Sequence, residues 1–369
     1  MAAIETAPER VAPGFLPAVA RWFLQSGIQE PSGGVARYYR MDEGRNARIS
    51  TEITGYAVSA FLTLHELTGD ARQRDAAVRA GDFLCENAWD ARAGIFPFEW
   101  SAAGDVPEKA AYFFDCGIIA RALARLYRKT GEEKYLERAK DCATGMLRDF
   151  VNGRDIDPIL ELPSKKPTPR DVRWSRSSGC YQLKSAVAWL EVGEATGERR
   201  LVQAYEDTLE AAMARQGGFL TEEGRGDRVM DRLHAYSYYL EGLLPRASTP
   251  EVAQALASGI KTAALHLRET RDSFERSDVC AQLLRVRLHA AALGAAGLDE
   301  SAAEEEANRA AALQMSSGDA RVDGAFCFGR RGAALLPFAN PVSGAFCLQA
   351  LAQWENRKTG GGLDWRELI

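Results

Sequence analysis

Internal repetition constrains the fold of this 369-residue chain more than any other feature of its sequence. Three stretches, 51–84, 114–147 and 179–213, share one pattern. Each has an apolar helical segment, then a Thr-Gly turn, then a helical segment with one polar face. Apolar residues recur at helical spacing in the first segment, as in Ile53, Tyr56 and Ala57. The repeat predicts an all-α fold made of helical hairpins.

The turns of these hairpins have a common chemistry. Gly69, Gly131 and Gly197 each follow a threonine, at intervals of 62 and 66 residues. Glycine adopts the left-handed backbone conformation that closes many helices at their C-terminus. We therefore expect each glycine to end the first helix of its hairpin.

Further segments extend the repeat to the rest of the chain. The stretches 233–267 and 277–313 fit the template more loosely. Segment 340–354 lacks a downstream partner and segment 14–24 lacks an upstream one, so we expect the two to pack together. The result is an (α/α)6 toroid, a six-hairpin barrel. Its inner helices are expected near 52–67, 115–129, 180–195, 233–244, 277–293 and 341–355.

This pattern predicts a single (α/α)6-barrel domain over 1–369, with a C-terminal tail over 356–369. Strands do not alternate with helices, and no Gly-x-Gly-x-x-Gly motif occurs, which argues against a Rossmann or TIM-type sheet. Long connections gather beside the N-termini of the inner helices. Because function concentrates on long loops held by a rigid scaffold, we expect the site on that face.

Composition limits the partners and the compartment. The net charge of −5 gives the chain no general reason to bind nucleic acid. No apolar run approaches the roughly 20 residues that span a bilayer. The N-terminal segment lacks the pattern of a signal peptide. The seven cysteines include no Cys-x-x-Cys pair, so they are interpreted as reduced packing residues. The sequence predicts a cytoplasmic protein without a membrane partner, a metal or another cofactor.

Two carboxylates are the leading catalytic candidates. Glu52 and Asp115 open the first helices of two successive hairpins. Glycoside hydrolysis needs one protonated and one ionised carboxyl group beside the scissile bond. Asp115 follows Tyr112, Phe113 and Phe114, and apolar surroundings raise the pKa of a carboxyl towards a useful range. The alternative is that both acids only cap their helices.

A third acid and one histidine occupy comparable positions. Asp278 opens the helix after Ser277, where it either caps the helix or orients a sugar hydroxyl. His234 is expected at the start of its inner helix and is a candidate proton-transfer group. Tyr236, two residues later, is a candidate for sugar contact; the alternative is inner-ring packing.

Aromatic and basic residues of the long connections complete the predicted site. Flat rings stack on the apolar faces of sugars, and arginines bind carboxylates. The two basic connections precede the first and third inner helices. They predict an acidic oligosaccharide as the partner. The candidate substrate-binding residues from these connections are Tyr38, Arg40, Trp100, Trp174 and Arg176.

At the residues quoted above, the chain resembles the six-hairpin (α/α)6-barrel glycosidase superfamily. The pattern is nearest to the unsaturated glucuronyl and rhamnogalacturonyl hydrolases. The resemblance implies that Glu52 and Asp115 occupy the two acidic positions, and that Asp115 protonates the double bond of the substrate. Trp174 and Arg176 match part of a Trp-Ala-Arg run. The chain departs from the pattern at Thr51-Glu52, where the family has His-Asp.

The sequence thus favours a carbohydrate-active enzyme, a glycoside hydrolase of uronate-containing oligosaccharides with Asp115 as acid and Glu52 as its partner. One alternative is a polysaccharide lyase or sugar epimerase, with His234 and a tyrosine as proton-transfer groups. The other is a non-catalytic sugar-binding protein on the same barrel. The sequence leaves the sugar, its linkage and the oligomeric state open.

Overall fold

The computed structural model describes residues 5–6, 14–171, 173–220, 226–358 and 362–369. Its contacts divide the chain into two compact units. One, the α2–α7 unit, comprises residues 29–36 and 48–219. The other, the α8–α12 unit, comprises residues 1–28, 37–47 and 220–369. The single-domain organisation and the tail over 356–369 stay predictions.

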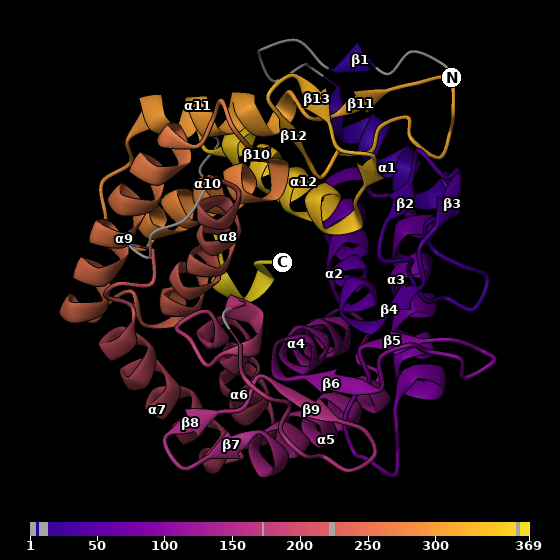
Figure 1. Ribbon diagram of the computed structural model, residues 1–369, viewed down its shortest axis with the longest axis vertical. Helices are drawn as coiled ribbons and strands as arrows, with labels where there is room; N and C mark the ends of the chain where they lie inside the picture. The colour runs from indigo at the N-terminus through magenta and orange to yellow at the C-terminus, as the bar shows by residue number, and fades with distance from the viewer. Residues whose placement is uncertain (1–4, 7–13, 172, 221–225, 359–361) are drawn as a thin grey trace. The chain divides into compact units, whose positions relative to one another are not determined.

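The α2–α7 unit consists of three helical hairpins in two layers (Figure 1). Its inner helices contact one another in sequence order, and each outer helix packs on the inner helix before it. The inner helices are α2 (Thr51–Thr68), α4 (Phe113–Thr130) and α6 (Gln182–Thr196). The outer helices are α3 (Ala71–Phe83), α5 (Glu133–Asp149) and α7 (Arg199–Arg215).

The predicted turns of this unit are confirmed. Gly69, Gly131 and Gly197 end the three inner helices with φ angles of 70°, 75° and 73°. The N–H groups of Gly69 and Gly131 each donate to the carbonyl four residues back, at 2.8 Å. These are left-handed C-caps, as the Thr-Gly pattern predicts.

Glycine also lets two inner helices approach closely. A Cβ atom on Gly117 of α4 would lie 2.6 Å from the carbonyl oxygen of Ser185 on α6. Because real Cβ atoms do not approach backbone so closely, a larger residue would push α4 and α6 apart. The polar side chain of Ser185 donates its hydroxyl to Phe114 O at 2.8 Å, at the start of α4.

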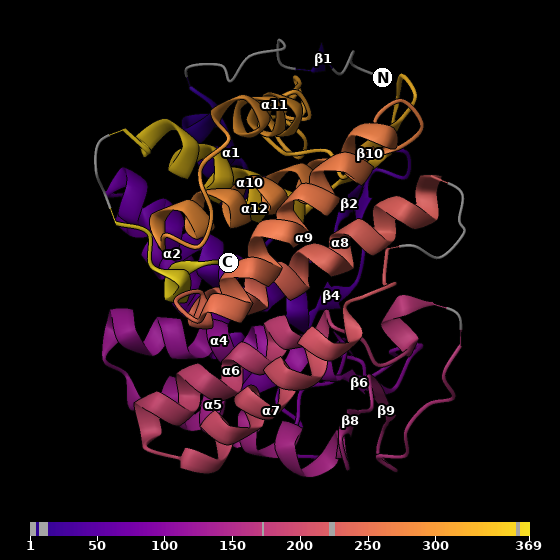
Figure 2. The ribbon, with the colours of Figure 1, turned by 90° about the vertical axis from the view of Figure 1, so that its left-hand side faces the viewer.

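The α8–α12 unit has the same layered construction. Helix α10 contacts both α8 and α12, and α9, α11 and α1 pack on these three helices; Figure 2 shows α9 beside α8. The predicted contact of segment 14–24 with the last helix is confirmed by α1 against α12, where Gly344 faces Phe23. The helices are α1 (Phe15–Gln25), α8 (Gly226–Leu243), α9 (Pro250–Glu269), α10 (Ser277–Ala292), α11 (Glu300–Ala311) and α12 (Pro341–Asn356).

One predicted helix start is wrong. Helix α8 begins at Gly226, about two turns before the expected position 233. The stretch 226–232 has apolar side chains only at Val229 and Met230, which is too few for a helical period, and helices are recognised in a sequence mainly by that period. His234 therefore lies inside α8 rather than at its start.

Short antiparallel strands decorate the connections between helices; within the described residues no sheet has more than three strands. The α2–α7 unit contains β4 (Ile49–Ser50), β5 (Glu99–Trp100), β6 (Ala110–Tyr112), β7 (Val151–Asn152), β8 (Asp155–Ile156) and β9 (Ile159–Glu161). The α8–α12 unit contains β1 (Glu5–Thr6), β2 (Tyr39–Arg40), β3 (Arg45–Asn46), β10 (Glu275–Arg276), β11 (Met315–Ser316), β12 (Gly329–Arg331), β13 (Ala334–Leu335) and β14 (Phe338–Ala339).

The cysteines are free thiols, and all but the half-buried Cys85 are buried. Burial raises the pKa of Cys180 and Cys280 to about 12, so these thiols stay protonated and unreactive at neutral pH. No helix in the described part of the chain has the length and apolar character needed to cross a membrane.

A buried histidine makes the stability of the α8–α12 unit depend on pH. His289 of α10 is fully buried, and its Nε2 lies 3.2 Å from the amide nitrogen of Gln353 on α12. Burial, followed by the charge of Arg285, lowers the pKa of His289 to about 3. The unfolded chain, with an ordinary histidine pKa near 6.5, binds this proton at pH 5 whereas the folded chain does not.

We therefore expect His289 to reduce the free energy of unfolding by about 2 kcal/mol between pH 7 and pH 5. The loss begins as the pH falls below about 6.5 and continues towards the folded pKa. Urea unfolding at both pH values measures it. A His289→Leu variant should lack this part of the pH dependence, whereas His266→Leu, at a more exposed site on α9, should retain it. Equal pH dependence in the His289 variant and the unmodified protein would refute the assignment.

Candidate active site

A hydrogen-bonded polar cluster surrounds His234 in the α8–α12 unit. The Nδ1 atom of His234 lies 2.7 Å from Oε1 of Gln282 on α10 and 3.8 Å from Oδ2 of Asp278. Arg276 binds Asp278 with two hydrogen bonds, of 3.0 and 2.6 Å, and Asp231 of α8 with a third of 2.9 Å. Asp278 and Gln282 are one turn apart on α10, so both face the same side.

Asp278 is held in its ionised form. Although burial raises the pKa of this carboxyl, the charges of Arg276 and His234 outweigh burial and leave the pKa below its ordinary value. The bidentate arginine geometry is the strong form of a charged hydrogen bond. Asp278 is therefore suited to stabilise a cation or orient a donor, but not to supply a proton.

Aromatic rings connect this cluster to the predicted sugar-binding loop. The guanidinium carbon of Arg276 lies 4.4 Å from the ring centre of Phe328. Phe328 contacts Phe338 edge-on at 6.4 Å, and Phe338 contacts Tyr38 in the same way at 5.0 Å. Arg40 lies over Phe338 at 5.7 Å. The structure thus brings Tyr38 and Arg40 into one continuous wall with the groups that hold Asp278.

Backbone contacts fasten this wall to the start of α10. Strand β10 pairs with β12, placing Arg276 opposite Gly329. The hydroxyl of Ser277 donates to the carbonyl of Cys327 at 2.7 Å. A Cβ atom on Gly329 would lie 2.3 Å from the Glu275 carbonyl oxygen, so this crossing requires glycine. The position of Asp278 is therefore fixed by strand pairing as well as by its arginine.

The two tyrosines near His234 point differently. The Tyr238 ring contacts His234 edge-on, with ring centres 4.5 Å apart. Tyr236, the predicted sugar contact, is buried, and its hydroxyl faces Gly259 of the outer helix α9. The structure therefore brings Tyr238 to His234 and places Tyr236 in the packing between α8 and α9.

Asp115 occupies a second polar position, in the α2–α7 unit. It lies in the first turn of α4 and is only 4% exposed. The Phe114 ring contacts the Tyr181 ring, with ring centres 6.2 Å apart. The pKa of Tyr112 is raised by burial, by the hydrogen bond to Glu108 and by the charge of Asp115. Asp115 thus lies in the aromatic surroundings that the sequence predicts.

Glu52 is less enclosed than Asp115. It is half-buried in the first turn of α2, and the side chain that caps this helix belongs to Ser50, which accepts from Ile53 N at 3.4 Å. Ser50, and not Glu52, therefore caps helix α2.

Trp100 lies on β5, whose partner strand β4 leads directly into α2. The Trp100 ring packs edge-on against Phe83, with ring centres 5.1 Å apart.

Trp174 and Arg176 lie together in a short 3₁₀ turn before α6. The Trp174 ring packs edge-on against Tyr181 at 5.0 Å. Arg176 lies 3.8 Å from Glu108, which also accepts a hydrogen bond from Tyr112 at 2.9 Å. Since Tyr112 and Tyr181 both surround Asp115, these two predicted binding residues belong to the Asp115 region.

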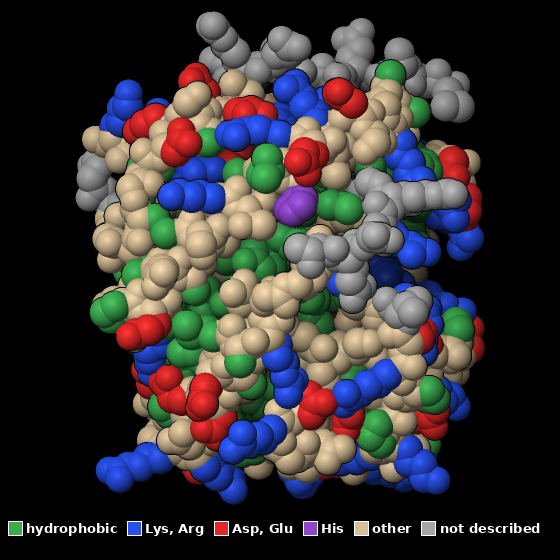
Figure 3. All heavy atoms as spheres, turned by 60° about the vertical axis from the view of Figure 1, so that its left-hand side comes forward, with side chains coloured by type: hydrophobic (Ala, Val, Ile, Leu, Met, Phe, Trp, Pro, Cys, Tyr) green, Lys and Arg blue, Asp and Glu red, His purple; other side chains and the backbone are tan. Residues whose placement is uncertain are grey.

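Carboxylates compensate most of the charge of the basic loops. Arg40 binds Asp42 at 2.8 Å and Glu43 at 2.6 Å, and Arg173 binds Asp171. Basic and acidic side chains are interspersed on the face shown in Figure 3. Such surface pairs stabilise little, but they reduce the positive field that an acidic ligand would meet.

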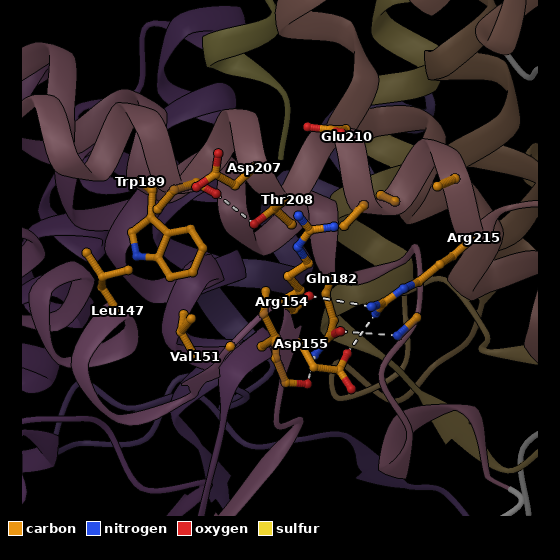
Figure 4. A pocket seen from close by; sticks show the side chains of 17 residues that line it. Leu147, Val151, Arg154, Asp155, Gln182, Trp189, Asp207, Thr208, Glu210 and Arg215 are labelled. Carbon is orange, nitrogen blue, oxygen red and sulfur yellow. Dashed lines mark hydrogen bonds and ion pairs between the residues drawn. The ribbon is translucent and has the colours of Figure 1, made fainter.

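A cavity of about 540 Å³ lies in the α2–α7 unit, between the β7–β8 hairpin and helices α6 and α7. Figure 4 shows Arg154 extending towards Thr208, and Arg215 bound to Asp155 at 2.7 Å. Trp189 and Val151 line another part of the cavity. None of the predicted site residues lines it.

Gln282 and Arg276 are members of the His234 cluster that sequence reasoning missed. Gln282 and Arg276 have no special spacing relative to His234, because they reach it from another helix and a strand. A local signal existed for both. Gln282 lies one turn after Asp278 on a helix face that continues with Arg285 and His289, and Arg276 precedes Asp278 by two positions.

Comparisons with known proteins give a likeness in fold. No family model and no curated protein matches the sequence. Cellobiose 2-epimerase from Spirochaeta thermophila superposes with a TM-score of 0.67 at 13% identity, covering 94% of this chain and 96% of that one. The predicted (α/α)6 fold is confirmed.

Two other solved structures agree over a similar length. A D-mannose isomerase gives a TM-score of 0.66 at 11% identity, covering 94% of this chain and 99% of that one. A possible member of the GH105 family from Klebsiella pneumoniae gives 0.59 at 14% identity, with 96% of each chain covered. Since one fold hosts unrelated chemistries, the function must be argued from the site.

Proposed function

We propose that this protein is a carbohydrate-active enzyme that interconverts an aldose and a ketose, with His234 as the proton-transfer group. The observation that carries the proposal is the His234 cluster: an imidazole held by Gln282, beside a carboxylate fixed by Arg276. The fold neighbours named as an isomerase and an epimerase act on sugars, which supports the substrate class.

The chemistry follows from the groups present. In an open-chain sugar, a base removes the proton from the carbon beside the carbonyl, and the electron pair forms an enediolate. Histidine suits this step because its ordinary pKa lies near neutral pH. The imidazolium then returns the proton to the neighbouring carbon, while the hydroxyl proton on the carbon that becomes the ketone moves to the oxygen of the former carbonyl. The ionised Asp278 stabilises the imidazolium between the two transfers.

The number of histidines favours isomerisation over epimerisation. Isomerisation can use one base that moves a proton between adjacent carbons on one face, whereas inversion at a carbon needs proton transfer on both faces. The chain has four histidines. His65 lies in the last turn of α2, where its Nδ1 is 3.1 Å from the Asp70 carbonyl oxygen, His266 lies on the outer helix α9, and His289 is buried near the end of α10. A single histidine therefore remains for the cluster.

A panel of sugars tests the proposal. Free aldoses, ketoses, linked disaccharides and the matching uronic acids are incubated with the protein, and the products are identified by NMR. We expect a ketose from an aldose of the same carbon chain. A new reducing end would indicate hydrolysis, an unsaturated uronate would indicate a lyase, and either result as the sole activity would refute isomerisation.

The acidity of the substrate stays part of the proposal. Tyr38 and Arg40 are joined to the cluster through Phe338, so a uronate carboxylate can compete for Arg40. Because Arg40 is already paired with Asp42 and Glu43, the preference should be modest and weaken with salt. Equal activity on matched neutral and acidic sugars at low and high salt would remove the acidic preference.

A glycoside hydrolase is the second candidate, supported by the buried position of Asp115 among aromatic rings. If Asp115 donates a proton, Asp115→Asn should lower turnover by about 10²–10⁴-fold, because the amide cannot supply that proton. Kinetics on any cleaved substrate measure the loss, with Asp141→Asn on the outer face of α5 as control. Under the isomerase proposal, Asp115→Asn should leave the proton-transfer step intact.

A further inference from the structure

Gln282 makes the shortest contact of His234 in the described cluster, yet an amide neither donates nor accepts a reacting proton. Its Oε1 lies 2.7 Å from Nδ1 of His234, and its side chain is fully buried. Its amide nitrogen is also buried and has no hydrogen-bond partner among the described residues. A buried N–H group without a hydrogen bond lowers the stability of the fold, so the presence of glutamine at this position needs an explanation.

We infer that Gln282 is a positioning residue that holds the proton of neutral His234 on Nδ1 and leaves the lone pair on Nε2. An amide oxygen only accepts, so the nitrogen that faces it must donate. The second nitrogen of a neutral imidazole is then the basic one. The inference rests on the proposed proton-transfer role of His234, but it makes a claim about the resting protein that needs no substrate.

The orientation of the amide follows from Asp278. Exchanging the oxygen and nitrogen of Gln282 would turn the amide N–H towards Nδ1, which would then have to carry the lone pair. That lone pair would lie 3.8 Å from the ionised carboxylate of Asp278. With the proton on Nδ1, the same carboxylate attracts the N–H group instead. Asp278 and Gln282 therefore favour one tautomer together.

The surrounding charges are fixed by their own contacts. Asp278 and Asp231 are both bound by Arg276, and Tyr238 contacts the imidazole with its ring. From α12, the Phe346 ring contacts Tyr238 edge-on, with ring centres 6.4 Å apart. Gln282 thus remains the neutral acceptor of the cluster, able to hold the imidazole in place before and after it takes up a proton.

The tautomer can be observed directly in the unmodified protein. Protonated and unprotonated imidazole nitrogens have widely separated ¹⁵N shifts, and the chain has four histidines to assign. With ¹⁵N-histidine labelling and His234→Ala for assignment, we expect neutral His234 to carry its proton on Nδ1. A proton on Nε2 in the unmodified protein would overturn the inference without any reference to activity.

Two variants test the role of the glutamine. Gln282→Leu removes the acceptor, so we expect a mixture of tautomers and a fall in kcat of about 10–100-fold with little change in KM. Gln282→Glu keeps an acceptor and adds a negative charge, which should keep the proton on Nδ1. It should also move the acid limb of the kcat/KM profile to higher pH, because a nearby anion stabilises the imidazolium. A purely structural glutamine would lose stability in Gln282→Leu without any change in the His234 tautomer.

Gln353→Leu is the control, because it removes another glutamine that contacts a histidine, with its amide nitrogen 3.2 Å from Nε2 of His289. It should leave kcat, the pH profile and the His234 tautomer unchanged. A His234 resonance that is identical in the unmodified protein and in Gln282→Leu would overturn the role of Gln282. Full turnover by His234→Ala would overturn the proposed function, while the NMR result would still decide the hydrogen bond.

Discussion

Replacing His234 with alanine is expected to lower the turnover of the sugar substrate by about 10²–10⁴-fold, the contribution typical of a general base. Asp278 is bound by Arg276 with two hydrogen bonds, so the proposal assigns the proton transfer to the imidazole. Because the substrate still meets the wall of Phe328, Phe338 and Tyr38, KM should change much less than kcat. Steady-state kinetics on the sugar found in the panel measure both constants.

The control for this variant is His266→Ala, which removes a histidine from the outer helix α9, where it contacts Glu269. Its turnover should be normal. Circular dichroism should show the same helix content and melting transition for both variants. If His234→Ala retains full turnover with normal folding, the proton-transfer group lies elsewhere, and the Asp115 region becomes the site to examine.

Replacing Arg285 with methionine is expected to lower the free energy of unfolding by about 3–5 kcal/mol. Arg285 of α10 is fully buried, and its guanidinium binds Glu241 of α8 at 2.5 Å and Gln349 of α12 at 3.1 Å. It also donates to the carbonyl of Ile369 at 3.1 Å. The substitution leaves the buried Glu241 carboxylate without its arginine, which costs far more than the loss of a surface pair.

Urea unfolding measures this loss, and two further variants locate its cause. Arg357→Met breaks a surface pair with Glu300 and should cost about 1 kcal/mol or less. The double variant Arg285→Met/Glu241→Gln removes both buried charges and should be more stable than Arg285→Met alone. A double variant as unstable as the sum of its single variants would show that the two charges do not act as a pair.

The repeated part of the fold was predictable because it is local. The Thr-Gly turn and the apolar residues at helical spacing both lie within a single hairpin. Gly69, Gly131 and Gly197 end their helices in the left-handed conformation that this turn predicts. The start of α8 was not predictable in the same way. Its first two turns, 226–232, have apolar side chains only at Val229 and Met230, and a regular apolar period is the main signal for a helix.

The residue types of the candidate site were predictable from the sequence, but the contacts between those residues were not. Asp278 and His234 were both candidates, yet their contact joins positions 44 residues apart and depends on how α8 packs on α10. The compensation of the basic loops had a local signal, since Asp171 and Arg173 are two residues apart. In a short Asp-x-Arg pattern of this kind, the arginine pairs with the aspartate two residues before it rather than with a ligand.

Exchange of a substrate hydrogen with solvent tests the central claim most directly. The sugar is incubated in D₂O with the unmodified protein and with His234→Ala, and deuterium beside the carbonyl carbon is followed by NMR. We predict that the unmodified protein introduces deuterium at that carbon and that His234→Ala does so at least 10²-fold more slowly. Exchange, or product formation, at an equal rate in the His234→Ala variant would contradict the account.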